Sequence, residues 1–354
     1  MEEPIESSVD TTLYPKITNH IKEVVKRLSY KLGNPFDLPE NIPIVGTVKL
    51  HGTHADILVY SDKTIVFQSR NKSNLLTTSD NQGFATSMTS KSSTILSLRS
   101  QYLDRWRLHN PNSELDKTQP VVIAGEWIGS KIQKDVALCQ LSKRFVIISV
   151  KINGSWVLDS EYAGIEAPED DIYNISRGGL YSSLLYPLDP EGTSENIEPM
   201  AESVADNCPF AESFGVTGAG EGIVWKLIPY HSDPDLWFKT KGGRFKPNFT
   251  PAPKKPAQGI LEKRKAAAKL AKAWCYGYRL RQGWEYLAEK HIERSLKGIG
   301  AFIKWMQNDI LLEEEGYIDE HGVDKQMLKT EIVKIAKSWF LEQLKEKKPT
   351  QYDI

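Results

Sequence analysis

A segment with three prolines, residues 250–259, divides this 354-residue chain into two parts whose apolar residues recur with different periods. Proline has a fixed φ and no backbone N–H, so neither a helix nor a central strand continues through such a segment. Before it, short runs of β-branched and aromatic residues alternate with turn residues, which is typical of antiparallel hairpins. After it, apolar residues are spaced as on amphipathic helices, across 261–291 and 323–344. The sequence therefore predicts an α+β protein: an antiparallel-sheet domain followed by a small all-helical C-terminal domain.

The domain boundaries follow from this division and from polar composition at the two ends. We expect a disordered N-terminus at residues 1–12, the sheet domain at 13–249 and a linker at 250–259. The helical domain follows at 260–346, and a tail at 347–354.

Composition and cysteine spacing exclude several classes of protein. Lys and Arg (45) nearly balance Asp and Glu (46), so any nucleic-acid-binding surface must be a local patch. Cys139, Cys208 and Cys275 lie far apart without a C-x-x-C pair, which argues against a zinc ribbon or a disulfide framework. No apolar run approaches the ~20 residues of a membrane span, and the acidic start is unlike a presequence. We expect a cytoplasmic or nuclear protein with no membrane partner.

The expected strands and helices place the polar residues of the sheet domain. Strands are expected at 44–48, 57–60, 64–69, 121–127, 144–151, 155–158, 222–228 and 236–241. Helices are expected at 18–32, 95–108 and 197–205. The polar stretches 71–93 and 159–220 are interpreted as loops, the second with one or two short helices.

Lys49 is predicted to end a buried strand, and a tight turn at His51, Gly52 and Thr53 leads into the next strand. A lysine amine has a reference pKa of about 10.4, so it is a weak nucleophile at neutral pH unless its surroundings favour the neutral form. Taken alone, the segment is more simply explained as a strand-edge lysine that covers its own turn.

Five polar signatures lie on or beside the expected strands. They are Lys49-x-His51-Gly52, Ser69-Arg70, Gly125-Glu126-Trp127, Glu221-Gly-x-x-x-Lys226 and Lys239-x-Lys241. Each has a simple structural explanation: Glu221 and Lys226 could form a weak surface pair, and the last two lysines a solvated strand face. Together, a nucleophilic lysine, further cations and two carboxylates suit a nucleoside triphosphate and its metal, because phosphoryl-type transfer depends on positioning and charge neutralisation.

In order and approximate spacing, these signatures resemble those of the covalent nucleotidyltransferase superfamily of ATP-dependent ligases and capping enzymes. DNA ligases and capping enzymes carry Asp where this chain has His51. Lys-Leu-His-Gly-Thr at residues 49–53 looks like the RNA ligase 2 branch, which includes a phage nick-sealing ligase and the kinetoplastid RNA-editing ligases. The segment Gly-Glu-Trp-Ile-Gly-Ser-Lys-Ile-Gln-Lys at 125–134 extends the match. The resemblance implies that the sheet domain is a nucleotidyltransferase domain.

This resemblance implies a role for each matching residue. Lys49 would attack the α-phosphate of ATP and form lysyl-AMP; AMP would pass to an RNA 5′-phosphate, and a 3′-hydroxyl would displace it. Glu221 would organise a divalent metal, Mg²⁺ or Mn²⁺. The implied catalytic residues are Lys49, His51, Glu221, Lys239 and Lys241. The implied nucleotide-binding residues are Val48, Leu50, Gly52, Arg70, Glu126, Ile148 and Lys226.

Two positions depart from the family pattern. The family has Asn where this chain has His54, and an aromatic residue, often followed by Asp, where this chain has Ile148 and Ser149. Phe145 lies three residues before Ile148. Two alternatives to an RNA ligase stay open: a DNA ligase or RNA guanylyltransferase of the same superfamily, and a nucleic-acid-binding pseudoenzyme.

The expected partner is a pair of RNA ends, in nicked or bridged duplex RNA, held by the helical domain. Basic and aromatic residues are interleaved across residues 261–291. This pattern has two explanations: a solvated basic face over an aromatic core, or a surface that contacts RNA phosphates. The resemblance favours the second, with Arg279 and Arg281 among the RNA contacts. The basic residues are Lys263, Arg264, Lys265, Lys269, Lys272, Arg279 and Arg281.

Overall fold

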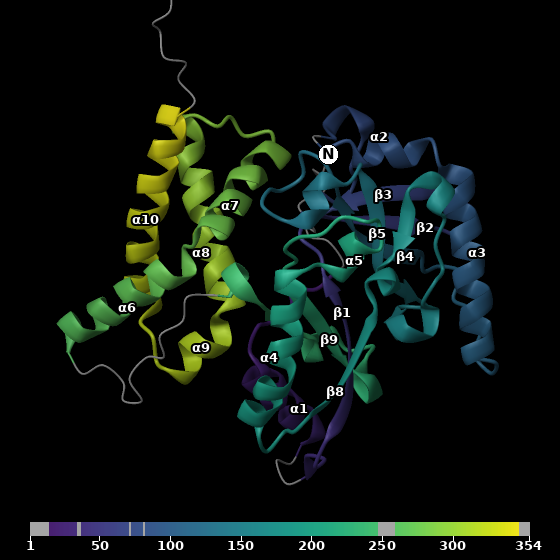
Figure 1. The fold of residues 1–354 in the computed structure, drawn as a ribbon, viewed down its shortest axis with the longest axis horizontal. Coiled ribbons are helices and arrows are strands. Elements are labelled where there is room, and N and C mark those ends of the chain that lie inside the picture. Colours follow the sequence, from purple (N-terminus) through teal and green to yellow (C-terminus); the bar gives the residue numbers. More distant parts are fainter. Residues whose placement is uncertain (1–13, 34–36, 71, 81, 247–258, 347–354) are drawn as a thin grey trace, which may run out of the picture. The chain divides into compact units, whose positions relative to one another are not determined.

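A computed structural model describes most of the chain in two compact units (Figure 1). The described residues are 14–33, 37–70, 72–80, 82–246 and 259–346. The predicted N-terminus and tail, and the linker apart from Gly259, lie outside them. The first unit comprises residues 1–17 and 21–243, and the second comprises residues 18–20 and 244–354. No described helix is both long and apolar enough to cross a membrane.

The first unit contains a four-stranded antiparallel sheet in the order β10-β9-β1-β8. Its strands are β1 (Ile42–Lys49), β8 (Leu180–Leu185), β9 (Gly222–Leu227) and β10 (Phe238–Lys241). Ile223 and Trp225 of β9 are fully buried, and helix α4 (Pro190–Asp206) packs against β8, β9 and β10. Gly46 of β1 lies opposite Trp225, and a Cβ there would be 2.6 Å from Ile223. This apolar side leaves the other face of the sheet for polar groups.

A second sheet of the first unit has the order β3-β2-β4-β5-β6, with β7 parallel to β5. Its strands are β2 (Thr53–Val59), β3 (Ile65–Ser69), β4 (Val121–Ile128), β5 (Arg144–Ile152), β6 (Ser155–Trp156) and β7 (Ile172–Asn174). Ala55, Ile57 and Trp127 face a core that also includes residues of α2 (Phe84–Thr89) and α3 (Ser92–His109). Because side chains alternate along a strand, His54 and Glu126 lie on the opposite face.

The second unit is helical and has its own apolar core. Its helices are α6 (Ile260–Trp274), α7 (Gly277–Glu289), α8 (Ile299–Glu313), α9 (Glu315–Glu320) and α10 (Lys325–Glu346). Trp274, Trp284, Phe302 and Phe340 are buried among these helices. The predicted fold class, antiparallel sheets with a helical C-terminal part, is confirmed.

Several element predictions were wrong in extent. The helix expected at 197–205 begins at Pro190, because Asp189 accepts a hydrogen bond from Gly192 N and proline suits the first helical turn. The expected loops contain ordered elements: α2 lies within 71–93, and β7 and β8 lie within 159–220.

The basic stretch 261–291, expected as one helical run, is broken into α6 and α7 at Cys275 and Tyr276. Arg279 Nη1 donates a hydrogen bond to Trp274 O at 3.2 Å, which satisfies a backbone carbonyl at the end of α6. The arginine that the sequence suggested for RNA contact therefore takes part in the turn between the two helices.

Candidate active site

The register of the four-stranded sheet gathers lysines on one face. Lys49 lies opposite Gly222 of β9, which in turn lies opposite Lys241 of β10. Residues directly opposite each other in antiparallel strands project to the same face. Lys226 and Lys239 follow on that face, because each is an even number of residues along its strand from these positions.

The turn after Lys49 connects the two sheets. Lys49 ends β1 in one sheet and Thr53 begins β2 in the other, as predicted for two strands joined by a tight turn. The lysine therefore lies where the two sheets of the first unit meet.

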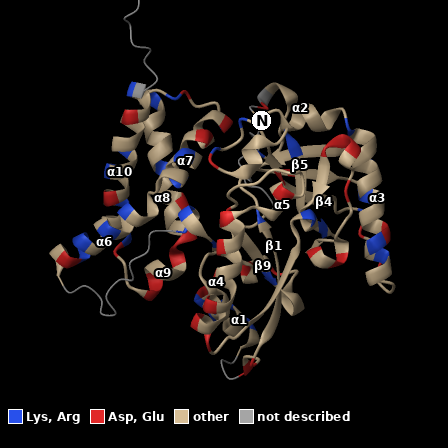
Figure 2. Cartoon of the chain, viewed as in Figure 1, with Lys and Arg blue, Asp and Glu red and all other residues tan. Residues whose placement is uncertain are grey.

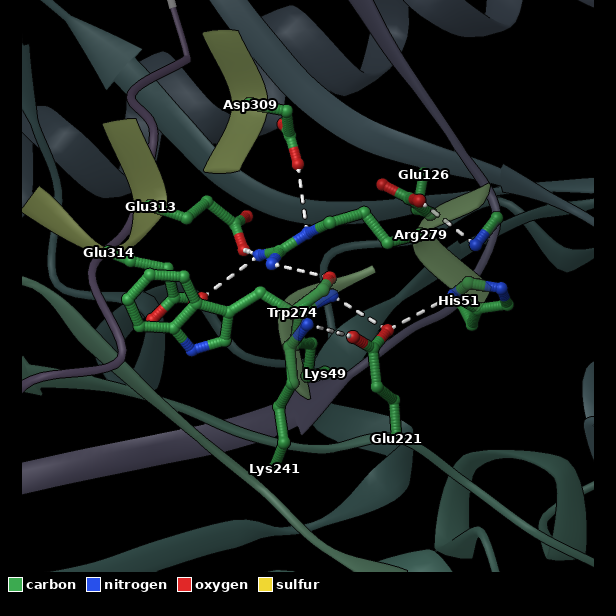
Figure 3. Close-up of polar contacts among 11 residues, drawn as sticks. Lys49, His51, Glu126, Glu221, Lys241, Trp274, Arg279, Asp309, Glu313 and Glu314 are labelled. Carbon is green, nitrogen blue, oxygen red and sulfur yellow. Dashed lines mark hydrogen bonds and ion pairs between the residues drawn. The ribbon is translucent and has the colours of Figure 1, made fainter. Parts of the chain in front are cut away.

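Glu221, directly before β9, brings Lys49, His51 and Lys241 together (Figure 3). Its Oε2 accepts a hydrogen bond from Lys49 Nζ at 2.7 Å and lies 3.2 Å from His51 Nδ1. Its Oε1 lies 3.3 Å from Lys241 Nζ. Burial opposes ionisation of the Glu221 carboxyl, but Lys49, Lys241 and His51 outweigh it and hold the pKa of Glu221 well below its usual range. Glu221 is therefore a carboxylate at neutral pH.

Glu126 on β4 reaches the turn that follows Lys49. Its Oε1 accepts a hydrogen bond from Gly52 N at 3.0 Å, and Gln133 Nε2 donates one to Gly52 O at 3.2 Å. Burial raises the pKa of Glu126 above its ordinary value, and the charges of His54 and Lys49 partly offset this rise. The second predicted carboxylate is thus held beside the turn that follows Lys49.

Gly52 permits this close approach, which gives a testable prediction. A Cβ at residue 52 would lie 2.5 Å from Trp127 O and 2.8 Å from Glu126 Cγ. Gly52→Ala should displace the turn from β4, lower the free energy of unfolding by about 1–3 kcal/mol and weaken nucleotide binding. Urea unfolding and ATP-binding titrations measure both effects. Gly300→Ala is the control, because a Cβ there meets no atom within 4 Å. If the free energy of unfolding and the ATP affinity of Gly52→Ala both match those of the unchanged protein, the close approach of Gly52 to β4 supports neither stability nor nucleotide binding.

A buried polar group beside Glu126 joins His54, already noted as a departure from the family pattern, to Asp56 and Tyr14, which were not predicted. His54, directly opposite Glu126 in the sheet, lies with its Nε2 2.9 Å from Asp56 Oδ1. The ring of Tyr14 stacks on His54 with centroids 4.9 Å apart. Burial, followed by the charges of Asp159 and Glu126, raises the pKa of Tyr14 well above its ordinary value, so its hydroxyl stays protonated. Tyr14 comes from the N-terminal segment, and no spacing rule links it to the strands.

Lys226 is neither exposed nor paired with Glu221, so the surface-pair interpretation is wrong. Its side chain is buried, and its Nζ lies 2.7 Å from Asp159 Oδ2 and donates a hydrogen bond to Ser149 Oγ at 2.7 Å. Lys226 thereby connects the two sheets, because Ser149 belongs to β5.

Ile148 occupies an irregular position in β5. Ser149 pairs with Ala124 of β4 and Ile147 pairs with Gly125, so Ile148 is the extra residue of a β-bulge. It is half-buried. Phe145 belongs to the core under the sheet, where a Cβ on Gly125 would lie 2.3 Å from its ring. No aromatic side chain of β5 therefore replaces the missing one at position 148.

The other predicted site residues differ in accessibility. Val48 lies opposite Ile223, on the face of the sheet away from Lys49, so its side chain belongs to the core. Leu50 is also buried. Arg70 is exposed after β3, and Lys239 is 6% exposed, so the solvated-face interpretation of the β10 lysines is wrong.

The side chains around Glu221 determine how the implied divalent metal would be held. Across the described ranges, no group of three His, Cys, Asp or Glu side chains is placed to hold a metal ion. Mg²⁺ commonly binds through one or two carboxylates together with substrate phosphates. The residues present therefore fit a metal that is bound jointly by Glu221 and a triphosphate. The assignment of Glu221 as a ligand stays a prediction.

Arg279 does not contribute to an exposed RNA-binding face, contrary to expectation. Its side chain is 1% exposed, and its guanidinium lies 3.2 Å from Asp309, 2.5 Å from Glu313 and 3.1 Å from Glu314 (Figure 3). Burial disfavours the charged guanidinium, but the carboxylates, Glu313 foremost, raise the pKa of Arg279 well above its usual value. Arg279 is a structural cation of the second unit.

Comparison with known proteins identifies the family. The model of the RNA ligase family matches residues 42–241, which is more than half of the chain and includes the site from Lys49 to Lys241. The chain belongs to the RNA ligase family. No curated protein matches it.

Solved structures of a Naegleria gruberi RNA ligase are also similar. The ligase with PPi shows 17% identity and a TM-score of 0.40, and the match covers 68% of this chain and 61% of that one. A variant with AMP and Mn shows 14% identity and a TM-score of 0.40, with 66% and 56% covered. The match thus spans less than two thirds of those ligase chains.

Proposed function

We propose that this protein is an ATP-dependent RNA ligase that joins a 3′-hydroxyl to a 5′-phosphate through a lysyl-AMP intermediate on Lys49. The observation that carries the proposal is the Lys49–Glu221 contact at 2.7 Å, with His51 and Lys241 on the same carboxylate. Membership of the RNA ligase family supports the assignment. ATP and Mg²⁺ or Mn²⁺ are the proposed cofactors.

The first step requires positioning and charge neutralisation more than acid–base chemistry. Glu221 orients the Lys49 amine at the end of β1. After the Lys49 ammonium loses one proton to solvent, the neutral amine nitrogen forms a bond to the α-phosphorus of ATP. The bond to the bridging oxygen breaks so that pyrophosphate leaves, and the nitrogen loses a second proton to give the phosphoramidate N–H. Lys239 and Lys241 neutralise the phosphates, and Glu126 binds the ribose hydroxyls. A divalent metal, when bound, supplies additional charge neutralisation at the phosphates.

The remaining steps transfer AMP and then release it. An oxygen of the RNA 5′-phosphate attacks the phosphorus of lysyl-AMP, and the Lys49 amine leaves and takes up a proton. The 3′-hydroxyl oxygen of the other RNA end then attacks the 5′-phosphorus, releasing AMP and a proton. Both steps concentrate negative charge beside the lysines of β10.

We propose RNA contact for the exposed cations of α6 and not for Arg279. Figure 2 shows blue segments of Lys and Arg along α6. Lys265, Lys269 and Lys272 are exposed. Their replacement by Glu should weaken binding of nicked duplex RNA and reduce the slope of log K against log salt by roughly one for each phosphate that is no longer neutralised. Fluorescence anisotropy across a salt series measures this, with Lys117→Glu in the first unit as the exposed control. An unchanged slope would assign the RNA surface elsewhere.

Labelling with radioactive ATP and GTP, followed by addition of RNA, tests the proposed function. An RNA ligase should form a protein–AMP adduct and then join nicked duplex RNA. A protein–GMP adduct would indicate a guanylyltransferase, joining of nicked DNA alone would indicate a DNA ligase, and absence of any adduct would indicate a nucleic-acid-binding pseudoenzyme.

A further inference from the structure

We propose that Asp159 is a positioning residue for Lys226: its carboxylate holds the Lys226 ammonium in the nucleotide site, from a segment that carries none of the predicted motifs. The inference rests on the proposed function, because it assumes that Lys226 helps to bind ATP. Asp159 begins a short 3-10 helix, Asp159–Tyr162, which follows β6. Ser149, where the family pattern often has Asp, does not itself carry a carboxylate.

Three neighbouring groups contact the Lys226 ammonium. Its Nζ lies 2.7 Å from Asp159 Oδ2 and 2.9 Å from Asp159 Oδ1, and it donates a hydrogen bond to Ser149 Oγ at 2.7 Å. It also lies 3.8 Å from the centroid of the Trp237 ring. The neighbours of the ammonium are thus one carboxylate, one hydroxyl and one aromatic face.

Asp159 is the charged member of this set. In the described part of the chain, it is the one carboxylate within ion-pair distance of Lys226 Nζ. Ser149 Oγ also donates to Asp159 Oδ1 at 3.0 Å, so the hydroxyl joins the two charged groups. The side chains of Lys226 and Asp159 are both more than nine-tenths buried, so solvent does little to screen their attraction.

The position of Asp159 affects the charge state of Lys226. Burial lowers the pKa of Lys226, and Asp159 acts in the opposite sense. A hydroxyl and an aromatic face stabilise a cation less than a carboxylate does. Without Asp159, a larger fraction of Lys226 would be neutral as the pH rises, and the ammonium would lose its directional anchor. Tyr14 is a neighbouring titratable group, but its raised pKa keeps its hydroxyl protonated and neutral over the same pH range.

Asp159→Asn tests the role by removing the charge while keeping the shape. The KM for ATP in lysyl-AMP formation should rise by at least about tenfold, because a buried ammonium loses its charged partner. The defect should be deepest at alkaline pH and shrink as the pH falls, since lower pH restores the Lys226 ammonium. A purely structural role would lower the amount of folded enzyme without this pH dependence. Asp104→Asn is the control, because Asp104 is 71% exposed.

A relocated carboxylate provides the second test. In a Ser149→Asp, Asp159→Ser double variant, the new carboxylate stands at the residue whose Oγ already lies 2.7 Å from Lys226. A cavity of about 10 Å³ adjoins Ser149 and Asp159, roughly the space of one water, so the larger side chain has some room. The double variant should recover most of the ATP affinity and restore the pH profile that Asp159→Asn alters. This variant also keeps the test valid if Asp159→Asn does not fold.

The outcomes separate this inference from the proposed function. If the unchanged protein forms no adduct with ATP, the proposed function fails. If it forms the adduct but Asp159→Asn has the same KM and pH profile, the positioning role is overturned. A folded double variant that stays as impaired as Asp159→Asn would also overturn it, because the carboxylate would then not be the operative feature.

Discussion

Lys49→Arg is expected to abolish formation of lysyl-AMP while leaving the fold intact. Arginine retains the positive charge that Glu221 contacts at 2.7 Å, so the buried carboxylate keeps a partner. Its guanidinium stays protonated at any accessible pH and cannot supply the neutral amine that attacks phosphorus. Adduct formation should therefore fall below detection, and joining of 5′-phosphorylated RNA should fall with it.

The measurement is transfer of label from ATP to the protein, accompanied by a thermal unfolding scan. Lys117→Arg is the control, because Lys117 is exposed on the same unit and should behave as the unchanged protein. Lys49→Ala should give the same chemical result but some loss of stability, since it leaves Glu221 with fewer cations. Labelling that persists in either Lys49 variant would assign the acceptor to another residue.

Arg279→Ala is expected to destabilise the second unit strongly. It would leave Asp309, Glu313 and Glu314 as neighbouring carboxylates and remove the hydrogen bond to Trp274 O. Removing one member of a buried ion cluster typically costs about 3–5 kcal/mol of stability, because the remaining charges are left unpaired.

Hydrogen exchange measures this effect locally, because amides of α6 to α10 should lose protection in Arg279→Ala. Arg264→Ala is the matched control, since that side chain is 62% exposed and its nearest carboxylate oxygen, on Glu331, is 3.6 Å away. Protection equal to that of Arg264→Ala would contradict the structural role and return Arg279 to the candidate RNA contacts.

The same cluster predicts how stability depends on pH. Burial raises the pKa of Glu314, but hydrogen bonding to His20 and the charge of Arg279 outweigh burial, so the pKa is lowered from its ordinary value of 4.5. A carboxyl with a lowered folded-state pKa contributes stability above pH 4.5 and loses that contribution as the pH falls through the folded value. Acid should therefore weaken the second unit, and Glu314→Gln should reduce this dependence.

The sequence predicted the parts of the site that belong to strands and short motifs. Lys49, Gly52 and Glu126 are close together because a strand end, a tight turn and a neighbouring strand are local features with recognisable spacing. The alternative explanation that paired Lys226 with Glu221 was wrong for the opposite reason. Asp159 comes from a stretch that resembled a loop, and its contact with Lys226 depends on the packing of two sheets.

Burial was the property that the pattern of residues predicted least well. Basic residues between 261 and 281 look alike in sequence, yet Lys265 is exposed and Arg279 is fully buried among carboxylates of α8 and its C-terminal end. Alternation within Lys239-Thr-Lys241 suggested a solvated face. In the structure, Lys241 contacts the Glu221 carboxylate, and Lys239 is buried on the same face of β10. Such burial depends on partners distant in sequence.

Mass spectrometry of the intact protein after incubation with ATP and Mg²⁺ tests the central claim most directly. We expect a mass increase of one adenylyl group per chain, located by peptide mapping on Lys49 and removed when nicked duplex RNA with a 5′-phosphate is added. An adduct on a different residue, or an adduct on Lys49 that RNA with a 5′-phosphate cannot discharge, would contradict the account.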